Sequence, residues 1–305
     1  MDITKQAEND VKIEGILSEV DLREGEYDKN GRKMPYIAGT IKVRVQQDIN
    51  GVNTLSEIPV RVFSNKYTNA GKENPSYLNM KKVADGVGFT SIAASSESSA
   101  TCVRITGASL AENNFPSRNN PEEIITTSCI NASFINAVNR AEFCPEATFI
   151  GTLVVGSIVE EVDRNGDSTG RLVVQGLIPQ YGGRVDMIKY IVASENAVSH
   201  IQSYWNQGDT VKVKGKINFS STTEYFEEEM GFGDPIRTAR TKSIHELIIT
   251  SGSAGALDEE MSYDIADVQK GLSERKQRIE AIKEKAKNSP KKAEKTETKA
   301  SNFDF

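Results

Sequence analysis

The sequence has little of what most catalytic or membrane-spanning proteins need. It holds three cysteines, Cys102, Cys129 and Cys144, without a CxxC spacing, and only two histidines. No apolar run approaches the roughly 18 residues of a membrane-spanning helix, and the first residues lack the apolar stretch of a signal peptide. We therefore expect a cytoplasmic protein with no membrane contact. Its cysteines are expected to be small buried residues rather than a disulfide or zinc framework.

Recognisable catalytic motifs are also missing. The chain has no GxxxxGK[ST] phosphate loop and no GxSxG turn. Neither His200 nor His245 has a recognisable metal-binding or nucleophile partner nearby in the sequence. The segment 163–169 (DRNGDST) resembles the start of a calcium loop, but Val174 stands where such a loop requires a bidentate Glu, so a hairpin turn is expected there. The sequence thus predicts a protein that is not an enzyme and binds no cofactor or metal.

The sequence does contain an internal repeat. Glu14–Arg32 and Ile150–Arg171 each hold a glycine-interrupted apolar strand, an EVD triplet, an Asn-Gly turn and a Gly-Arg step. Further along, Val103–Leu110 (VRITGASL) matches Val211–Asn218 (VKVKGKIN), and each is followed by another apolar segment, SCINASFIN in the first copy and SIHELIITS in the second. The duplication predicts two similar all-β units of about a hundred residues each.

Both units alternate apolar and polar residues, as half-buried strands do. Tyr36–Val45 and Ile58–Phe63 alternate in the first unit, where Ser76–Asp85 is a short helix candidate. In the second unit Thr210–Phe219 alternates, and Glu195–Asn206 has helical spacing. Three strands, a helix and two more strands is the order of the OB-fold, a five-stranded Greek-key barrel. We predict a mainly β protein with two tandem OB-fold-like barrels; another small barrel or a sandwich is the alternative.

Composition sets the boundaries that we expect. Asp21–Lys33 is charged and predicts a turn-rich loop, whereas Ser220–Ser243 predicts a long hairpin-like excursion. Asp258–Lys287 suits an amphipathic helix, and Asn288–Ala300 has nothing to bury and should be disordered. The expected divisions are an N-terminal arm (1–8), a first barrel (9–136), a linker (137–144), a second barrel (145–253), a helical segment (254–288) and a disordered tail (289–305).

The outward faces of the predicted strands carry cations and aromatic residues. Cations can follow a phosphate backbone while aromatic rings stack on bases, which is the combination that binds single strands without sequence preference. The candidate nucleic-acid-binding residues are Tyr36, Lys42, Arg44, Arg61, Phe63, Arg104, Arg171, Lys189, Lys212, Lys214, Lys216, Tyr225 and Phe226, with Tyr181 in an adjoining loop. For any single residue the alternative is that it only solubilises an exposed strand.

The overall charge favours a different reading of the same faces. The first 254 residues hold 26 basic and 32 acidic side chains, whereas a nucleic-acid-binding domain is usually basic. A barrel pair that binds other proteins, as an interaction scaffold, is therefore one alternative function. A nuclease is a second alternative, suggested only by scattered carboxylates. If the protein binds nucleic acid, its affinity should depend on geometry and stacking more than on bulk charge.

The last five residues, SNFDF, have the form of a short linear motif. Phe303 and Phe305 can enter apolar pockets of a partner, and Asp304 can meet a basic rim. With the tandem OB-like units and the polar linker, this tip resembles the single-stranded DNA-binding proteins of bacteria and especially of bacteriophages. The resemblance implies a protein that coats single-stranded DNA and recruits replication, recombination or repair proteins through the tip. The single Asp304 departs from the acidic cluster usual in that family.

Overall fold

The computed structural model describes residues 6–29, 31–117, 120–228 and 236–288, and no side chain of residues 224–228, 236, 237, 240 or 288. The SNFDF tip, with Phe303, Asp304 and Phe305, lies outside these residues. The first half contains β1 (Asn9–Lys29), β2 (Arg32–Ile49), β3 (Val52–Asn65), α1 (Pro75–Ala84), β4 (Cys102–Pro116) and β5 (Ile124–Ala137). The second half contains β6 (Glu146–Val162), β7 (Ser168–Pro179), β8 (Val185–Val192), α2 (Glu195–Tyr204), β9 (Thr210–Glu228), β10 (Ile236–Gly252) and α3 (Ile265–Asn288).

The first five strands close into a barrel. Their order is β3-β2-β1-β4-β5, and β3 pairs in parallel with β5 from Val60↔Ile130 to Val62↔Ala132. Neighbouring pairs along the rest of the barrel are antiparallel, and α1 lies between β3 and β4 in the chain. This is the OB-fold arrangement that the element order predicts.

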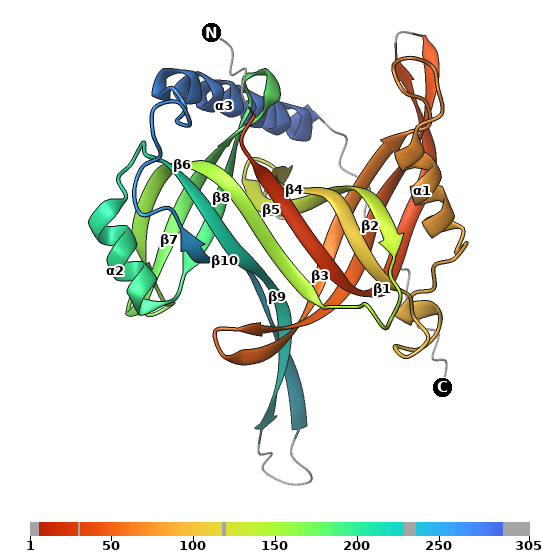
Figure 1. Cartoon of the computed structure of the whole chain (residues 1–305), viewed down its shortest axis with the longest axis horizontal. Coiled ribbons are helices and arrows are strands. Elements are labelled where there is room, and N and C mark those ends of the chain that lie inside the picture. The colour runs from red at the N-terminus through yellow and green to blue at the C-terminus, as the bar shows by residue number, and fades with distance from the viewer. Residues whose placement is uncertain (1–5, 30, 118–119, 229–235, 289–305) are drawn as a thin grey trace, which may run out of the picture.

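The second five strands repeat the arrangement. β6 pairs with β7 and β9, β7 pairs with β8, and β9 pairs with β10, all antiparallel. A single parallel pair, Ile191↔Ile248, joins β8 to β10 and closes the barrel. The repeated sequence segments therefore occupy corresponding strands: β1–β2 and β6–β7, β4 and β9, β5 and β10. The predicted fold class, two OB-fold-like barrels followed by a helix, is confirmed, and Figure 1 shows the two barrels side by side.

The alternating strands place their apolar residues as predicted. On β2, Ile37, Ile41, Val43 and Val45 are buried, while the residues between them are more exposed. The same holds for the apolar positions of β3 and β9. Burial of apolar surface contributes about 25 cal/mol for each Å². These inward rows are therefore the main stabilising element of each barrel. The apolar interiors of the two barrels form one continuous core.

Besides the connection between β5 and β6, the two barrels are joined directly by strand pairing. Residues 9–14 of β1 pair antiparallel with residues 146–151 of β6, so both barrels belong to one ten-stranded sheet. Gln47, which is buried between them, donates to the Ile217 carbonyl at 2.8 Å and accepts from the Ala147 amide at 3.0 Å. A buried amide that satisfies both its donor and its acceptor fixes the geometry around it.

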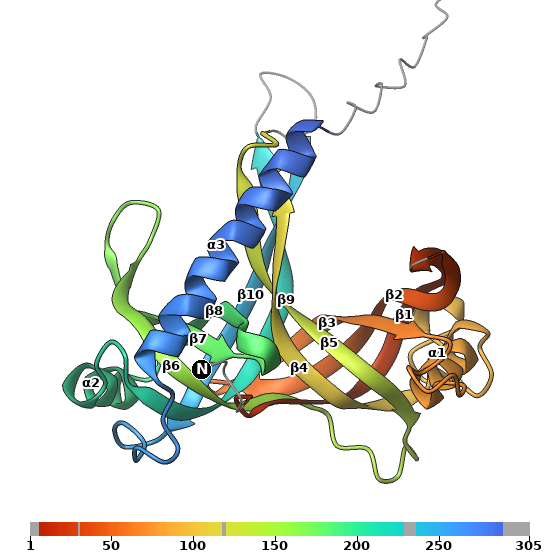
Figure 2. The ribbon, with the colours of Figure 1, turned by 90° about the horizontal axis from the view of Figure 1, so that it is seen from above.

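Helix α3 lies across both barrels. Its buried Val268 packs against Val154, Leu177 and Val185 of the second barrel. Arg275 forms an ion pair of 2.6 Å with Glu112 on β4 of the first barrel, and Figure 2 shows α3 extending toward the β4–β5 hairpin. The helix predicted within Asp258–Lys287 therefore exists, and it holds the two barrels in one orientation.

Two local expectations are wrong. Asp21–Lys33 is not a loop, because β1 and β2 stay paired as far as Lys29↔Arg32 and form a long hairpin. Its charged residues are compatible with a strand because both faces of a projecting hairpin meet water. The cysteines are free, as predicted, but only Cys102 is buried; Cys144 is exposed on the connection between the barrels. Ser220–Ser243 does form the predicted hairpin, as an extension of β9 and β10.

Candidate nucleic-acid interface

The long β1–β2 hairpin extends the outer face of the first barrel. Side chains two apart on a strand share a face, so the outward row of β2 runs from Lys42 through Tyr36 to Arg32. Tyr27 of β1 lies diagonally across from Tyr36, with ring centroids 5.9 Å apart. Phe63 of β3 stacks on the other side of Tyr36 at 5.4 Å and 28°. We call Tyr27, Tyr36 and Phe63 the aromatic row.

The aromatic row is open to solvent at its β3 end, where Phe63 keeps 59% of its surface exposed. Strand β3 carries Phe63 outward because Val60 and Val62 fill the core on the opposite face. A large ring held at the surface in this way leaves one π face available, and an exposed aromatic ring is the group on which a nucleic-acid base stacks.

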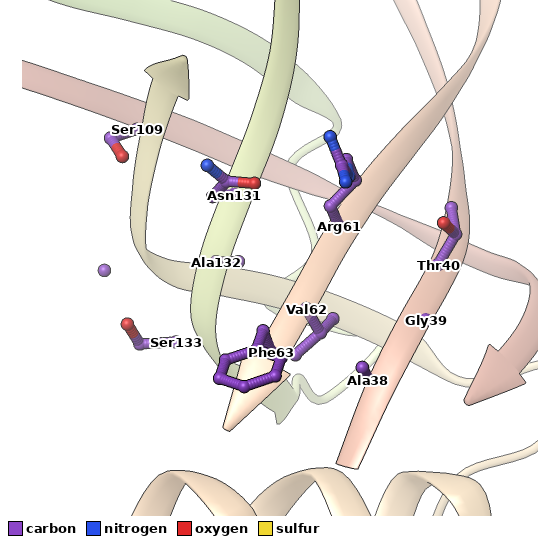
Figure 3. A pocket seen from close by; sticks show the side chains of 11 residues that line it. Ala38, Gly39, Thr40, Arg61, Val62, Phe63, Ser109, Asn131, Ala132 and Ser133 are labelled. Carbon is purple, nitrogen blue, oxygen red and sulfur yellow. The ribbon is translucent and has the colours of Figure 1, made fainter. Parts of the chain in front are cut away.

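A pocket of about 540 Å³ lies directly beside Phe63. In Figure 3, Arg61 and Phe63 of β3 lie between Thr40 of β2 and the side chains of Asn131 and Ser133 of β5. Arg61 donates from Nη1 to the Asn113 Oδ1 at 2.8 Å and, within the described residues, has no acidic partner. The pocket therefore combines one available guanidinium with neutral hydrogen-bonding groups and an aromatic wall.

A second, more basic pocket lies at the far end of the β1–β2 hairpin. It has a volume of about 760 Å³ and is lined by Lys29, Arg32, Lys33 and Tyr67, among others. Lys33 is 3.6 Å from Glu26 in an exposed ion pair, which contributes little. Lys66 lies over the Tyr67 ring at 5.6 Å. This basic pocket continues the outward rows of β1 and β2 beyond the aromatic row.

Several predicted cations of the first barrel are already paired. Lys42 lies 2.6 Å from Glu19, and this hydrogen-bonded pair raises the pKa of Lys42. Arg44 lies 3.1 Å from Glu97. These pairs lower the positive potential of the face, so Arg61 is the strand cation best placed to meet a phosphate.

Arg104 has a structural role beside a buried acid. Its Nε lies 2.7 Å from Glu14, which is almost completely buried where β1 meets both β4 and β6. Burial by itself would raise the pKa of Glu14, but the hydrogen bonds from Arg104 and from the Cys144 amide hold it below its usual value. Arg104 therefore stabilises the junction of the barrels and lies away from the aromatic row.

The predicted cations of the second barrel are divided in the same way. Arg171 lies between Glu161 and Glu246, at 3.1 Å and 2.7 Å. Lys212 pairs with Glu8 at 2.7 Å, and Lys216 donates to the Asp48 carbonyl of the first barrel at 2.5 Å. Lys189 and Lys214 are exposed and have no ion-pair partner within the described part of the chain. The lysine row of β9 thus holds neighbouring segments together more than it presents charge.

Tyr225 and Phe226 cannot be assigned a surface. Their backbone belongs to the β9–β10 hairpin, where they pair with Ala239 and Thr238, but their side chains lie outside the described residues. Sequence reasoning overlooked Tyr27, Lys29, Arg32 and Tyr67. The period-two pattern could have identified Tyr27 and Arg32 if the strands had been extended through the charged segment.

The equivalent face of the second barrel is partly covered. Leu177, Val185 and Met187 point outward from β7 and β8, and α3 packs on them through Val268 and Leu272. An apolar patch that a helix covers is not available to a ligand. Among the described residues, the β2–β3 face of the first barrel is therefore more open than the β7–β8 face of the second.

Other kinds of site find no support among the described residues. No group of three or more His, Cys, Asp or Glu side chains there could hold a metal ion. The calcium-loop-like segment is a hairpin turn, in which the Asp163 carboxylate accepts from the Asn165 and Asp167 amides. Within the same residues, every helix is too short or too polar to cross a membrane.

Comparison with known proteins places the chain in a family. A family model described as YorF matches residues 7–285, which is most of the sequence. The chain belongs to the YorF family. No curated protein matches this YorF chain in sequence.

Two solved structures are distantly similar to the YorF chain. One is the wild-type single-stranded DNA-binding protein from Thermus aquaticus, 11% identical, covering 83% of this chain and 96% of that one, with a TM-score of 0.45. The other is a deletion mutant of the same protein, also 11% identical, covering 83% and 97%, with a TM-score of 0.48. At this identity and these TM-scores, neither similarity identifies a function for this chain.

Proposed function

We propose that this protein binds single-stranded DNA without strong sequence preference, and that it does so on the outer face of its first barrel. The observation that carries the proposal is the aromatic row, which lies between Arg61 on one side and the basic pocket on the other. Strands two and three of an OB barrel, with the loop that joins strands one and two, form the surface on which OB-folds bind oligonucleotides.

The chemistry of this face favours unpaired strands. A base can stack on Phe63 only if its own face is accessible, and pairing within a duplex hides both faces of each base. Stacking on aromatic side chains contributes about 1–3 kcal/mol per base and tolerates every base. Arg61 and the basic pocket would hold the phosphates, while Thr40, Asn131 and Ser133 offer hydrogen bonds that no particular base requires.

The proposal also covers the C-terminal tip. We expect Phe303, Asp304 and Phe305 to recruit replication or recombination proteins to the coated strand, as the resemblance of the tip to those of single-stranded DNA-binding proteins implies. Deleting residues 301–305 should leave DNA affinity within about twofold and abolish pull-down of such a partner. Equal pull-down by the truncated and full-length chains would refute the recruitment role.

The decisive experiment is a titration of the full chain with labelled oligo(dT), the matching duplex and the matching RNA strand, each followed by fluorescence anisotropy over a salt series. We expect binding to oligo(dT) that exceeds binding to the duplex. Absence of binding to oligo(dT), or a preference for the duplex, would overturn the proposal. The same mixtures incubated with Mg²⁺ or Mn²⁺ should show intact DNA; cleavage would support a nuclease instead.

One observation favours a protein-interaction scaffold as the second candidate. Lys42, Arg44, Arg104, Arg171 and Lys212 all lie in ion pairs, so much of the strand charge is neutralised. A scaffold would show no salt-sensitive affinity for any oligonucleotide, and the titration distinguishes the two candidates directly.

A further inference from the structure

The pocket beside Phe63 does not end on the first barrel. Ser109 of β4 and Asn131 of β5 line it, and the same two residues line a second pocket of about 270 Å³. That second pocket also includes Tyr181 and Arg184 of the second barrel. We call it the junction pocket. Because the two pockets share Ser109 and Asn131, they are adjacent, and together they extend from the aromatic row to the second barrel. We call this pair of adjacent pockets the groove.

The second-barrel side of the groove repeats the chemistry of the first. Tyr181, in the short 3-10 turn between β7 and β8, has 78% of its surface exposed. Arg184 follows two glycines later, and its side chain is more than half exposed. An exposed ring and a guanidinium in one turn are the pair of groups that a base and its phosphate require.

An acidic group in the same pocket could neutralise the charge of Arg184. Asp186 is buried, and its carboxylate lies 3.6 Å from an Nη of Arg184. Burial raises the pKa of Asp186. The contact orients Arg184 but neutralises only part of its charge, since the Arg184 side chain remains mostly in water. A phosphate can therefore approach the guanidinium from the solvent side.

The turn that carries Tyr181 is held in place from two sides, by the N-terminal segment and by helix α3. The Ala7 amide donates to the Pro179 carbonyl at 2.9 Å, and Gln6 donates to the Gln180 side chain at 3.2 Å. Helix α3 approaches so closely that a Cβ on Gly271 would lie 2.6 Å from the Gly183 carbonyl. Because the β1–β6 pairing fixes the barrels, the groove exists before any ligand binds.

We propose that a DNA strand bound on the first barrel continues along this groove and reaches the second barrel at the junction pocket. Tyr181 stacks on a base there, and Arg184 meets a phosphate. The inference rests on the proposed function, since it concerns the path of the same single strand. It predicts that Tyr181 and Arg184 matter only for strands long enough to cover both sites; one OB barrel accommodates about 4–16 nucleotides.

The test compares oligo(dT) strands from about 6 to about 30 nucleotides, a range that spans one to two OB sites. The proteins are the full wild-type chain, the double variant Tyr181→Ala/Arg184→Ala, and Phe63→Ala. Tyr204→Ala is the matched control, because Tyr204 is also an exposed tyrosine of the second barrel but lies on α2. Circular dichroism of each variant serves to check that it is folded.

We expect the double variant to bind short strands as the wild type does and to lose at least about tenfold in affinity for long ones. Phe63→Ala should weaken binding at every length. If the double variant matches the wild type at all lengths, or loses equally at all lengths, the groove inference is wrong while the proposed function stands. If the wild type binds no strand of any length, the proposed function itself fails.

Discussion

Replacing Phe63 by alanine separates a binding role from a structural one. The ring is 59% exposed and stacks on Tyr36 at the edge of the barrel. Full burial of a phenylalanine side chain is worth about 1.5–3 kcal/mol, so the buried two-fifths contributes about 1 kcal/mol. Loss of the ring pair adds about 0.5–1.5 kcal/mol, so the unfolding free energy should fall by about 1.5–2.5 kcal/mol.

The expected effect of Phe63→Ala on DNA affinity is proportionally larger than its effect on stability. Losing one stacked base costs about 1–3 kcal/mol, which corresponds to a rise in Kd of about 5- to 150-fold. A fall of about 1.5–2.5 kcal/mol in stability leaves a domain of ordinary stability folded. The variant should therefore be a well-folded protein with weak affinity for single-stranded DNA.

The assay is an anisotropy titration with oligo(dT) at fixed salt, alongside chemical denaturation of the same samples. Tyr204→Ala serves as the control, because its ring is 60% exposed but lies away from the aromatic row. Phe63→Trp should restore most of the affinity, since indole stacks on bases as well. The reasoning is refuted if Phe63→Ala and Tyr204→Ala bind DNA equally well.

Four further outcomes follow from the structure. Glu14→Gln should lower the unfolding free energy at pH 7 by about 1.5–3 kcal/mol. The folded state depresses the pKa of Glu14 below its usual 4.5, so the stabilisation from this group is present above pH 4.5 and disappears as the pH falls through the folded pKa. Denaturation curves of the variant and the wild type should therefore converge in acid. Arg275→Ala leaves Glu112, whose side chain is only 3% exposed, without its ion-pair partner. The free energy of unfolding, measured in urea, should fall by about 3–5 kcal/mol. Lys276→Ala on the same helix is the control and should lower it far less. Gly39→Ala should destabilise the first barrel, because Gly39 has a φ of +152° and a Cβ there would lie 1.9 Å from a backbone carbonyl of β1; an unchanged melting temperature would contradict this. The logarithm of the DNA association constant should fall with the logarithm of salt concentration at a slope of about −2 to −3, as about three or four phosphate contacts would give, and a slope near zero would exclude phosphate contacts.

Much of the fold could be predicted from local patterns. The two copies of the EVD and Gly-Arg segments, and the strict alternation in Tyr36–Val45 and Thr210–Phe219, identify strands because side-chain direction reverses at every residue. The element order then suggests the barrel. The hairpin at Asp21–Lys33 was missed because its strands have no buried face, and without one the alternation has no apolar signal.

The candidate site was harder to predict, because charge in a sequence does not show which charges are neutralised. Lys212 meets Glu8, and Lys216 meets Asp48, across more than 160 positions of chain. Arg61 and Phe63 were selected by the same alternation rule as Lys42, and only the structure separates the available cation from the paired one. Burial of the β7–β8 face by α3 is likewise invisible in the sequence.

For the strands that have one buried face, the sequence alone indicates which residues point inward, since that depends on period-two geometry and apolar burial. Tertiary structure decided which outward residues form a surface. The β1–β6 pairing and α3 bring Asn131 of one barrel into the same pocket as Tyr181 and Arg184 of the other. Such proximity depends on how two closed barrels dock, and docking is set by long-range contacts that no local pattern encodes.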